Sequence, residues 1–270
     1  MEALIKTARA FYGTGIAALG VQQFIYADFR PVIFPAAPLW MHASPIWAYA
    51  VGAALIVAGI LIAVGKKERI TSLLLGGFLF VMFIIFQSSY TLFIQPNSPV
   101  HLGLWTDPLK ELALSGGAFV MAGLAKNESN TSHKNYLFIV LEKFIPFGRI
   151  FFSITMLLFG VAHFYYPEFV ATLVPAWIPG HTFWTYFAGV ALILSGAAII
   201  LKIRLKTVAL LLSSMLFLWV LLLHIPRAIA DPYTGNGNEV TSVFEALAFC
   251  GIALGIANMS NKSFKKNVIA

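Results

Sequence analysis

Residues 47–59 read WAYAVGAALIVAG, and residues 184–196 read WTYFAGVALILSG. The two stretches share the pattern W-x-Y-x-x-G-x-A-L-I-x-x-G, which is improbable by chance even in apolar sequence. Neighbouring features follow in the same order: Gly20–Tyr26 matches Gly160–Tyr166, Gln87 matches His224, and Glu111 matches Glu245. Because self-similarity of this kind is typical of a repeated structural unit, the chain is predicted to hold two copies of one unit.

Composition places these units in a membrane, since 59% of the 270 residues are hydrophobic and only 11% are charged. A helix needs about 20 mostly apolar residues to cross the hydrocarbon core. Eight segments meet this requirement: Ala8–Tyr26, Pro45–Val64, Ile70–Phe93, Pro108–Ala125, Gly148–Tyr166, Thr182–Leu201, Lys206–Ile225 and Val240–Asn258. The predicted fold class is an all-α polytopic membrane protein with eight transmembrane helices. Four helices in each unit give both units the same orientation, so the repeats are predicted to be parallel.

The basic residues predict the orientation. With both termini in the cytoplasm, 15 of the 18 Lys and Arg residues lie on the cytoplasmic side, as the positive-inside rule expects. The exceptions are Arg30, Lys110 and Arg227. This distribution explains the net charge of +7 without a nucleic-acid partner. The expected surroundings are a lipid bilayer, crossed several times by the chain.

Three regions follow from the repeat. Residues 1–126 form the first four-helix unit, residues 127–147 form a cytoplasmic linker, and residues 148–270 form the second unit. The linker opens with a polar run and ends in an apolar segment, Tyr136–Leu141, which is predicted to be a short interfacial helix. Proline-rich loops, Asp28–Ser44 and Pro167–His181, are too broken by proline to span the membrane. Each is expected to fold back over the outer mouth of its own four-helix bundle.

Ionisable residues near the outer ends of the second unit's helices predict a site. His163, His224 and Glu245 fall at similar depth on three helices, and Arg227 follows His224 by three residues. Charged groups are costly in hydrocarbon, so they usually face a partner or a cavity. The first unit has Gln23, Gln87 and Glu111 at the matching positions. The second unit is therefore expected to hold the chemically more capable site.

Three interpretations of these residues are open. They could form a hydrogen-bonded structural cluster, with Arg227 pairing Glu245 or Asp231. Alternatively they could line a pocket for a polar head group, with Tyr166, Trp177 and Trp184 as apolar walls and a histidine that exchanges a proton. A two-histidine, one-carboxylate metal site is the least favoured, because two histidines on different helices are a weak signature. No metal is therefore expected.

The second half resembles the DoxX-like family of small four-helix membrane proteins. The resemblance lies in Phe159–Phe164 with Pro167, in Val174–Pro179, in Phe187–Gly189 and in His224–Arg227. It covers the first half more loosely, so the chain looks like a tandem DoxX pair. The resemblance implies a compact bundle in the bacterial inner membrane and association with a quinone or a membrane redox complex. It supplies no catalytic motif, and with Cys250 as the single cysteine the chain departs from relatives that work through paired cysteines.

Three functions are consistent with these features. The first is a membrane subunit or small enzyme that binds a quinone-like or lipid-like molecule in the outer half of the second bundle. The second is a non-catalytic scaffold or assembly partner whose polar residues fix the helix register. Transport ranks last, because the inner halves of the predicted helices offer no ionisable path.

Overall fold

The computed structural model describes residues 2–36, 38–95, 100–126 and 136–259, and the regular structure in these ranges is helical throughout. The first half contains α1 (Glu2–Tyr26), α2 (Leu39–His42), α3 (Pro45–Val64), α4 (Glu68–Met82), η1 (Phe83–Ser88), η2 (Tyr90–Ile94), η3 (Leu102–Trp105) and α5 (Thr106–Leu124). The second half contains α6 (Tyr136–Glu142), η5 (Ile145–Phe147), α7 (Gly148–Tyr165), α8 (Pro167–Leu173), α9 (His181–Ile200), α10 (Leu205–Trp219), η6 (Val220–His224), α11 (Ile225–Ala230) and α12 (Thr234–Met259).

Six helices are long and apolar enough to cross a membrane: Pro45–Val64, Glu68–Ile94, Tyr136–Tyr165, His181–Ile200, Leu205–Ala230 and Thr234–Met259. The protein is therefore a multi-pass membrane protein. The other two predicted spans are helical as α1 and α5, but they are more polar. Three charged residues fall in the first two turns of α5, and α1 carries Arg9, Gln22 and Gln23. That α1 and α5 also cross the membrane stays a prediction.

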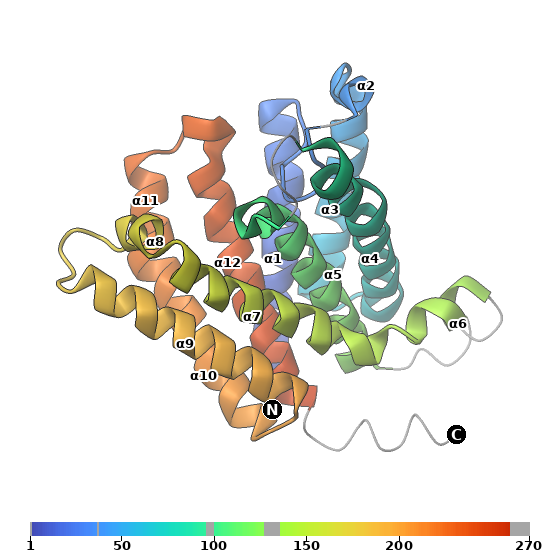
Figure 1. Ribbon diagram of the computed structural model, residues 1–270. Helices are drawn as coiled ribbons and strands as arrows, with labels where there is room; N and C mark the ends of the chain where they lie inside the picture. Colours follow the sequence, from blue (N-terminus) through green and yellow to red (C-terminus); the bar gives the residue numbers. More distant parts are fainter. Residues whose placement is uncertain (1, 37, 96–99, 127–135, 260–270) are drawn as a thin grey trace.

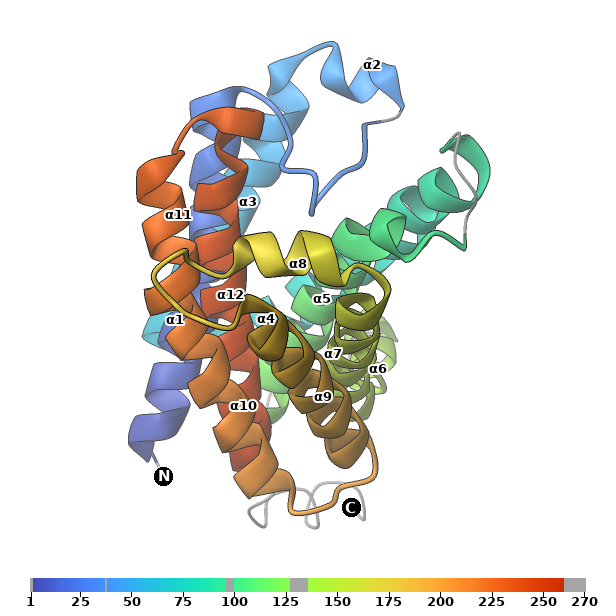
Figure 2. The same ribbon diagram turned by 60° about the vertical axis from the view of Figure 1, so that its left-hand side comes forward.

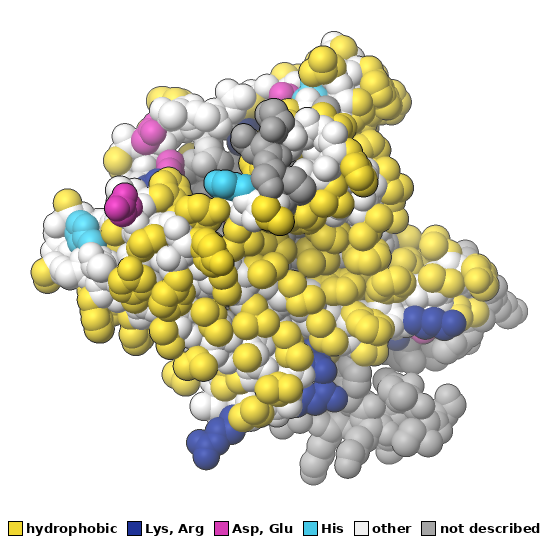
Figure 3. Space-filling model, in the orientation of Figure 1, with side chains coloured by type: hydrophobic (Ala, Val, Ile, Leu, Met, Phe, Trp, Pro, Cys, Tyr) yellow, Lys and Arg dark blue, Asp and Glu magenta, His cyan; other side chains and the backbone are white. Residues whose placement is uncertain are grey.

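The molecule has two distinct ends (Figure 1). The loop end carries α2, α8 and α11, whereas α1 begins and α12 finishes at the opposite end (Figure 1). A broad hydrophobic face lies between these ends, with acidic and histidine side chains near the loop end and most of the visible Lys and Arg side chains near the other (Figure 3). This is the surface expected of a protein surrounded by lipid. Which end faces the cytoplasm stays a prediction.

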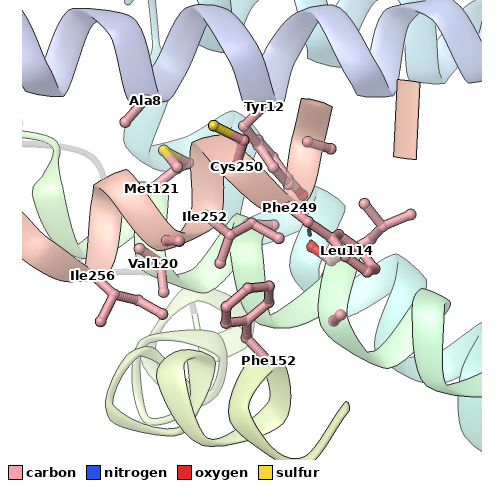
Figure 4. Packing of buried hydrophobic residues seen from close by; sticks show 14 of the residues in the cluster. Ala8, Tyr12, Leu114, Val120, Met121, Phe152, Phe249, Cys250, Ile252 and Ile256 are labelled. Carbon is pink, nitrogen blue, oxygen red and sulfur yellow. Dashed lines mark hydrogen bonds between the residues drawn. The ribbon is translucent and has the colours of Figure 1, made fainter. Parts of the chain in front are cut away.

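The last helices of the two halves, α5 and α12, form the centre of the protein. Every residue from 111 to 122 and from 248 to 258 is buried. Runs of small residues such as Ser115-Gly116-Gly117-Ala118 allow this close approach. Tyr12, Leu114, Phe152 and Phe249 meet at this centre, where the Tyr12 hydroxyl donates to the Leu114 carbonyl at 2.7 Å (Figure 4).

The helices do not sort into two separate bundles. α1 packs along α3 of its own half and along α12 of the other half, while α7 packs along α9 and along α5. Each half therefore contributes its last helix to the other half. The expectation of a self-contained second bundle was wrong in this respect, because the apolar helix faces allow either partner and only the small-residue surfaces decide between them.

Close contacts occur at matching positions in the two halves. A methyl group built on Gly20 would lie 2.5 Å from the Gly52 carbonyl oxygen, and one on Gly160 would lie 2.7 Å from the Gly189 carbonyl oxygen. The π-helical segments η1 and η6 also match, and they carry Gln87 and His224 respectively. Such π-helical turns are frequent at functional sites.

The two proline-rich loops differ. The segment from Phe29 to Pro35 dips into the protein at the loop end (Figure 2), where Val32 and Ile33 are buried in the main core. In the second half, residues from Pro167 form the short helix α8, which packs on α9 and α7. Only the first loop becomes part of the core. The polar opening of the linker, 127–135, lies outside the described residues.

Candidate functional site

Lys110 lies among charged side chains at the loop end that we call the central polar cluster: Arg30, Asp107, Lys110, Glu111 and Glu245. Its Nζ atom is 2.9 Å from Glu245 Oε2 on α12 and 3.4 Å from Asp107 Oδ1, one turn earlier on α5. The side chains of Lys110 and Glu245 are only 17% and 5% exposed. A buried ion pair therefore joins the two central helices.

Arg30 enters this cluster from the loop that follows α1. Its carbonyl oxygen accepts bonds from the amides of Ile33 and Phe34, which fixes a tight turn. The guanidinium lies over the Tyr26 ring, with Cζ 4.8 Å from the ring centroid, and the residue is 1% exposed. Burial lowers the pKa of Arg30, while the nearby Tyr26 hydroxyl and the carboxyl groups of Glu245, Asp28 and Asp107 act in the opposite direction. None of the described residues hydrogen-bonds its Nε and Nη2 atoms.

Two cavities open on either side of this loop. The larger, of about 360 Å³, is lined by Asp28, Phe29, Arg30, Pro31, Phe34, Ala36, His42, Gly235 and Asn236. The smaller, of about 180 Å³, has Gln87, Asp107 and the loop residues Pro31 and Pro35 in its lining. The larger cavity combines aromatic walls with a buried cation, a combination found in sites for small molecules.

Side chains outside the loop hold it in place. Gln87 Nε2 donates to the Pro31 carbonyl oxygen at 2.6 Å. His42 Nδ1 is 2.7 Å from Asp28 Oδ1, and His42 Nε2 is 2.9 Å from the Pro35 carbonyl oxygen. The loop is thus tethered at both ends and in its middle.

The structure brings only some of the predicted site residues of the second half near one another. His163 is half-buried on α7, where Nδ1 bonds the Phe159 carbonyl oxygen at 2.7 Å and the ring stacks on Trp219. His224 ends η6 and interacts electrostatically with Lys110, Arg227 and Glu239. Among the described residues no hydrogen bond or ion pair joins either histidine to Glu245, which pairs with Lys110 instead. Within the described residues, no group of three His, Cys, Asp or Glu side chains could hold a metal ion.

Arg227 pairs with Glu239, so the predicted pairing with Glu245 or Asp231 was wrong. The guanidinium uses Nε and Nη2 to hold the two carboxylate oxygens, with an Nε to Oε2 distance of 2.9 Å. The reason is position along the helix, because Glu239 precedes Glu245 on α12 by six residues and so lies closer to the start of α12, which follows the end of α11.

The predicted aromatic walls lie elsewhere. Tyr166 contacts His101, its hydroxyl being 3.5 Å from Nδ1. Trp184 donates to the Pro179 carbonyl oxygen at 3.2 Å, and Trp177 is 67% exposed. None of the three lines the cavities described above. Their positions agree with an aromatic belt in the membrane interface.

The matching residues of the first half are closer to the central polar cluster. Glu111 belongs to it, and within residues 2–36, 38–95, 100–126 and 136–259 neither of its carboxylate oxygens has a hydrogen-bond partner although the residue is fully buried. Gln23 is equally buried, and its amide has no partner within the same ranges. Its neighbour Gln22 accepts a bond from Thr241 on α12 at 2.9 Å. The first half thus supplies more of the buried polar groups than expected.

Sequence reasoning missed Arg30 and Lys110 as site residues. A signal was present, because Arg30, Lys110 and Arg227 are the three exceptions to the predicted positive-inside distribution. In the structure Arg30 and Lys110 lie in the cluster and Arg227 lies beside it, through its interaction with His224. The three exceptions to the predicted charge distribution were therefore the signal in the sequence for this cluster.

Comparison with known proteins gives limited guidance. Residues 152–247 match the model of a family described as a domain of unknown function, DUF8561. The match covers less than half of the chain and includes His163, His224, Arg227 and Glu245. No curated protein and no solved structure matches the chain. The resemblance to the DoxX-like family stays a prediction.

Proposed function

We propose that this membrane protein binds a small amphiphilic molecule, lipid-like or quinone-like, in the larger cavity at the loop end. The observation that carries this proposal is the composition of the cavity wall, where Phe29 and Phe34 stand beside Arg30, His42 and Asn236. An apolar wall accepts a chain or ring, while the polar side chains hold a head group. The site lies where the two halves meet and not within the second half.

The volume suits a small ligand or the head-group portion of a larger one. About 360 Å³ is at the lower end of the range for small-molecule pockets. The cavity is also partly open, so the tail of a longer amphiphile would extend out of it.

Extraction of bound molecules tests this proposal. The protein is purified in mild detergent, and co-purified lipids and quinones are measured by mass spectrometry against an unrelated membrane protein. Ala36→Trp fills the cavity and is expected to remove the enriched species, whereas Ala43→Trp, at an exposed position of the same end that does not line the cavity, keeps it. No enrichment, or equal enrichment in both variants, contradicts the proposal.

A scaffold role is the second candidate, and the Lys110 and Glu245 pair favours it. That pair is buried and complete, as is the pairing of Arg227 with Glu239. Complete pairs of this kind can fix helix register without any ligand. If the protein is a scaffold, Ala36→Trp is expected to leave every cellular phenotype unchanged. A partner complex is then expected to be lost only in variants that unfold the protein.

We further propose that the halves arose by duplication and that both termini lie in the cytoplasm of a bacterium, with the protein in the inner membrane. The matching glycine contacts and the matching π-helical turns support the duplication. Association with a membrane redox complex is a related proposal. Purification of the tagged chain from its native membrane, with redox proteins scored among the partners, tests it.

A further inference from the structure

The Nε and Nη2 edge of the guanidinium can be compared in three arginines: Arg30 is 1% exposed, and the side chains of Arg69 and Arg227 are 12% and 31% exposed. Arg227 uses this edge to hold both oxygens of Glu239, and Arg69 uses it to hold Glu142 Oε1 at 3.1 and 2.8 Å. In Arg30 the same two atoms are shielded from solvent and find no hydrogen-bond partner in the part of the chain that the structure describes. The pair of Arg227 with Glu239 shows that this guanidinium edge binds a carboxylate elsewhere in the same chain.

Charge strengthens the comparison. An arginine side chain stays protonated in proteins, so its burial without a counter-ion is costly. Lys110 contacts two carboxylates, Arg227 contacts Glu239 and His42 contacts Asp28, whereas Arg30 has no ion-pair partner among the described residues. Its compensation is electrostatic interaction with Glu245, Asp28 and Asp107, and two of these carboxylates, Glu245 and Asp107, already contact Lys110.

We propose that the Nε and Nη2 edge of Arg30 binds an oxyanion, a carboxylate or a phosphate, which is the head group of the ligand in the larger cavity. Two parallel hydrogen bonds from one guanidinium edge match the spacing of two oxygens in either group. The inference rests on the proposed function and deepens it, because it selects acidic amphiphiles over neutral quinones. Arg30 already lines the cavity.

Access to the edge requires a movement. Both nitrogen atoms are covered in this structure, so the ligand reaches them when the loop Phe29–Ala36 shifts or the guanidinium turns away from Tyr26. The tethers from Gln87 and His42 limit how far the loop moves. A head group that pairs with Arg30 replaces the contact with the Tyr26 ring by two charge-assisted hydrogen bonds, which are the stronger interaction.

Binding measurements with defined probes test the proposal. Octanoate and octyl phosphate carry the oxyanion, octanol and menadione are neutral, and acetate and inorganic phosphate lack the tail. In calorimetric titrations of the purified protein, octanoate or octyl phosphate is expected to bind, and Arg30→Gln is expected to weaken that binding by at least about tenfold. Arg30→Lys keeps the charge but loses the paired geometry, so its affinity for octanoate or octyl phosphate is expected to lie between those of the wild type and Arg30→Gln.

Arg227→Gln is the matched control, because the same edge of that arginine is already occupied by Glu239. It is expected to leave the octanoate affinity within about twofold of wild type, in keeping with a group that makes no ligand contact. A second readout needs no variant: octanoate, but not octanol, should slow the modification of Arg30 by phenylglyoxal, measured by peptide mass spectrometry. This readout holds even if Arg30→Gln does not fold.

Each outcome is decisive. One result overturns the oxyanion inference but leaves the proposed function standing. In it, menadione binds, octanoate and octyl phosphate do not, and menadione binding is abolished by Ala36→Trp but unchanged by Arg30→Gln. Acetate or inorganic phosphate binding as tightly as the octyl probes supports the oxyanion site but contradicts an amphiphilic ligand. Failure of every oxyanion probe to bind or to protect Arg30 overturns the inference.

Discussion

Lys110 Nζ lies 2.9 Å from Glu245 Oε2 and so links the last helix of the first half to the last helix of the second half. The two residues are buried at the loop end of the protein, where α5 and α12 run through its centre. Each half packs its first helix on the other half's last helix: α1 packs on α12, and α7 packs on α5. The ion pair joins the two helices, α5 and α12, that are exchanged in this way. It is therefore placed to select the observed packing over two separate bundles.

Loss of one partner is expected to destabilise the protein strongly. Lys110→Met leaves Glu245 buried without its cation, and Glu245→Leu leaves Lys110 with Asp107 alone. A broken buried pair costs about 3–5 kcal/mol, whereas replacement of both partners by apolar residues is often close to neutral. The double variant is therefore expected to recover a large part of the loss. Thermal unfolding in detergent of the wild type, both single variants and the double variant measures this coupling.

The exposed pair between Lys6 and Glu2 is the control. Its side chains are 64% and 83% exposed, and the pair also has an N to O distance of 2.8 Å. Exposed pairs contribute about 0–1 kcal/mol, so Lys6→Ala is expected to change the stability little. Equal effects of Lys6→Ala and Lys110→Met would show that the position of Lys110 between the two helices has no special importance.

The helical, membrane-embedded class could be predicted from the sequence, because run length and apolar composition decide it locally. For example, α3 begins at Pro45 and ends before Gly65, and α9 begins directly after Gly180. The partner of each helix could not be predicted. α1 has one small-residue surface against Gly52 and Gly59 and another against Ala248 and Gly251, and the sequence does not say whether α5 or α12 supplies the second partner.

The site was predicted only in part for the same reason. Glu245 was identified by its depth, but its partner Lys110 belongs to the other half of the chain and could be found only with the exchange of helices known. His163 has the chemistry of a site residue, yet its ring bonds the Phe159 carbonyl oxygen of its own helix and stacks on Trp219. Residue type and depth along a helix do not specify the direction in which a side chain points.

The matching carboxyl groups Glu111 and Glu245 are expected to respond in opposite ways to the same substitution. Glu245→Gln removes the charge that pairs with Lys110 but keeps an oxygen that accepts a hydrogen bond, so it is expected to lower stability by about 1.5–3 kcal/mol, less than the loss of the whole side chain. Glu111→Gln keeps the shape of a fully buried side chain whose oxygens have no partner. It is expected to leave the melting temperature unchanged or to raise it. A loss of stability in Glu111→Gln as large as in Glu245→Gln would mean that Glu111 has a charged partner.

Glycine contacts offer a test of the proposed duplication. Gly20→Ala and Gly160→Ala each drive a methyl group into a backbone carbonyl, at Gly52 and Gly189 respectively. Helices pushed apart at such contacts lose packing along their length, so both variants are expected to lose about 1–3 kcal/mol. Gly103→Ala is the control, since the added methyl meets only the exposed His101 side chain. Thermal unfolding of the three variants checks this, and a large effect at only one of the two matching glycines would contradict equivalent contacts.

The tethers of the loop between α1 and α2 control its opening. His42→Leu removes the contacts with Asp28 and with the Pro35 carbonyl oxygen, and Gln87→Leu removes the bond to the Pro31 carbonyl oxygen. Since a hydrogen bond contributes about 0.5–1.5 kcal/mol, each variant is expected to speed exchange of the Ile33 and Phe34 amides about two- to tenfold. Hydrogen exchange followed by mass spectrometry measures this, with His181→Leu at the start of α9 as the control. If the loop exchanges at the same rate in all three variants, these side chains do not hold it, and the movement that exposes Arg30 must be limited by the buried Val32 and Ile33 instead.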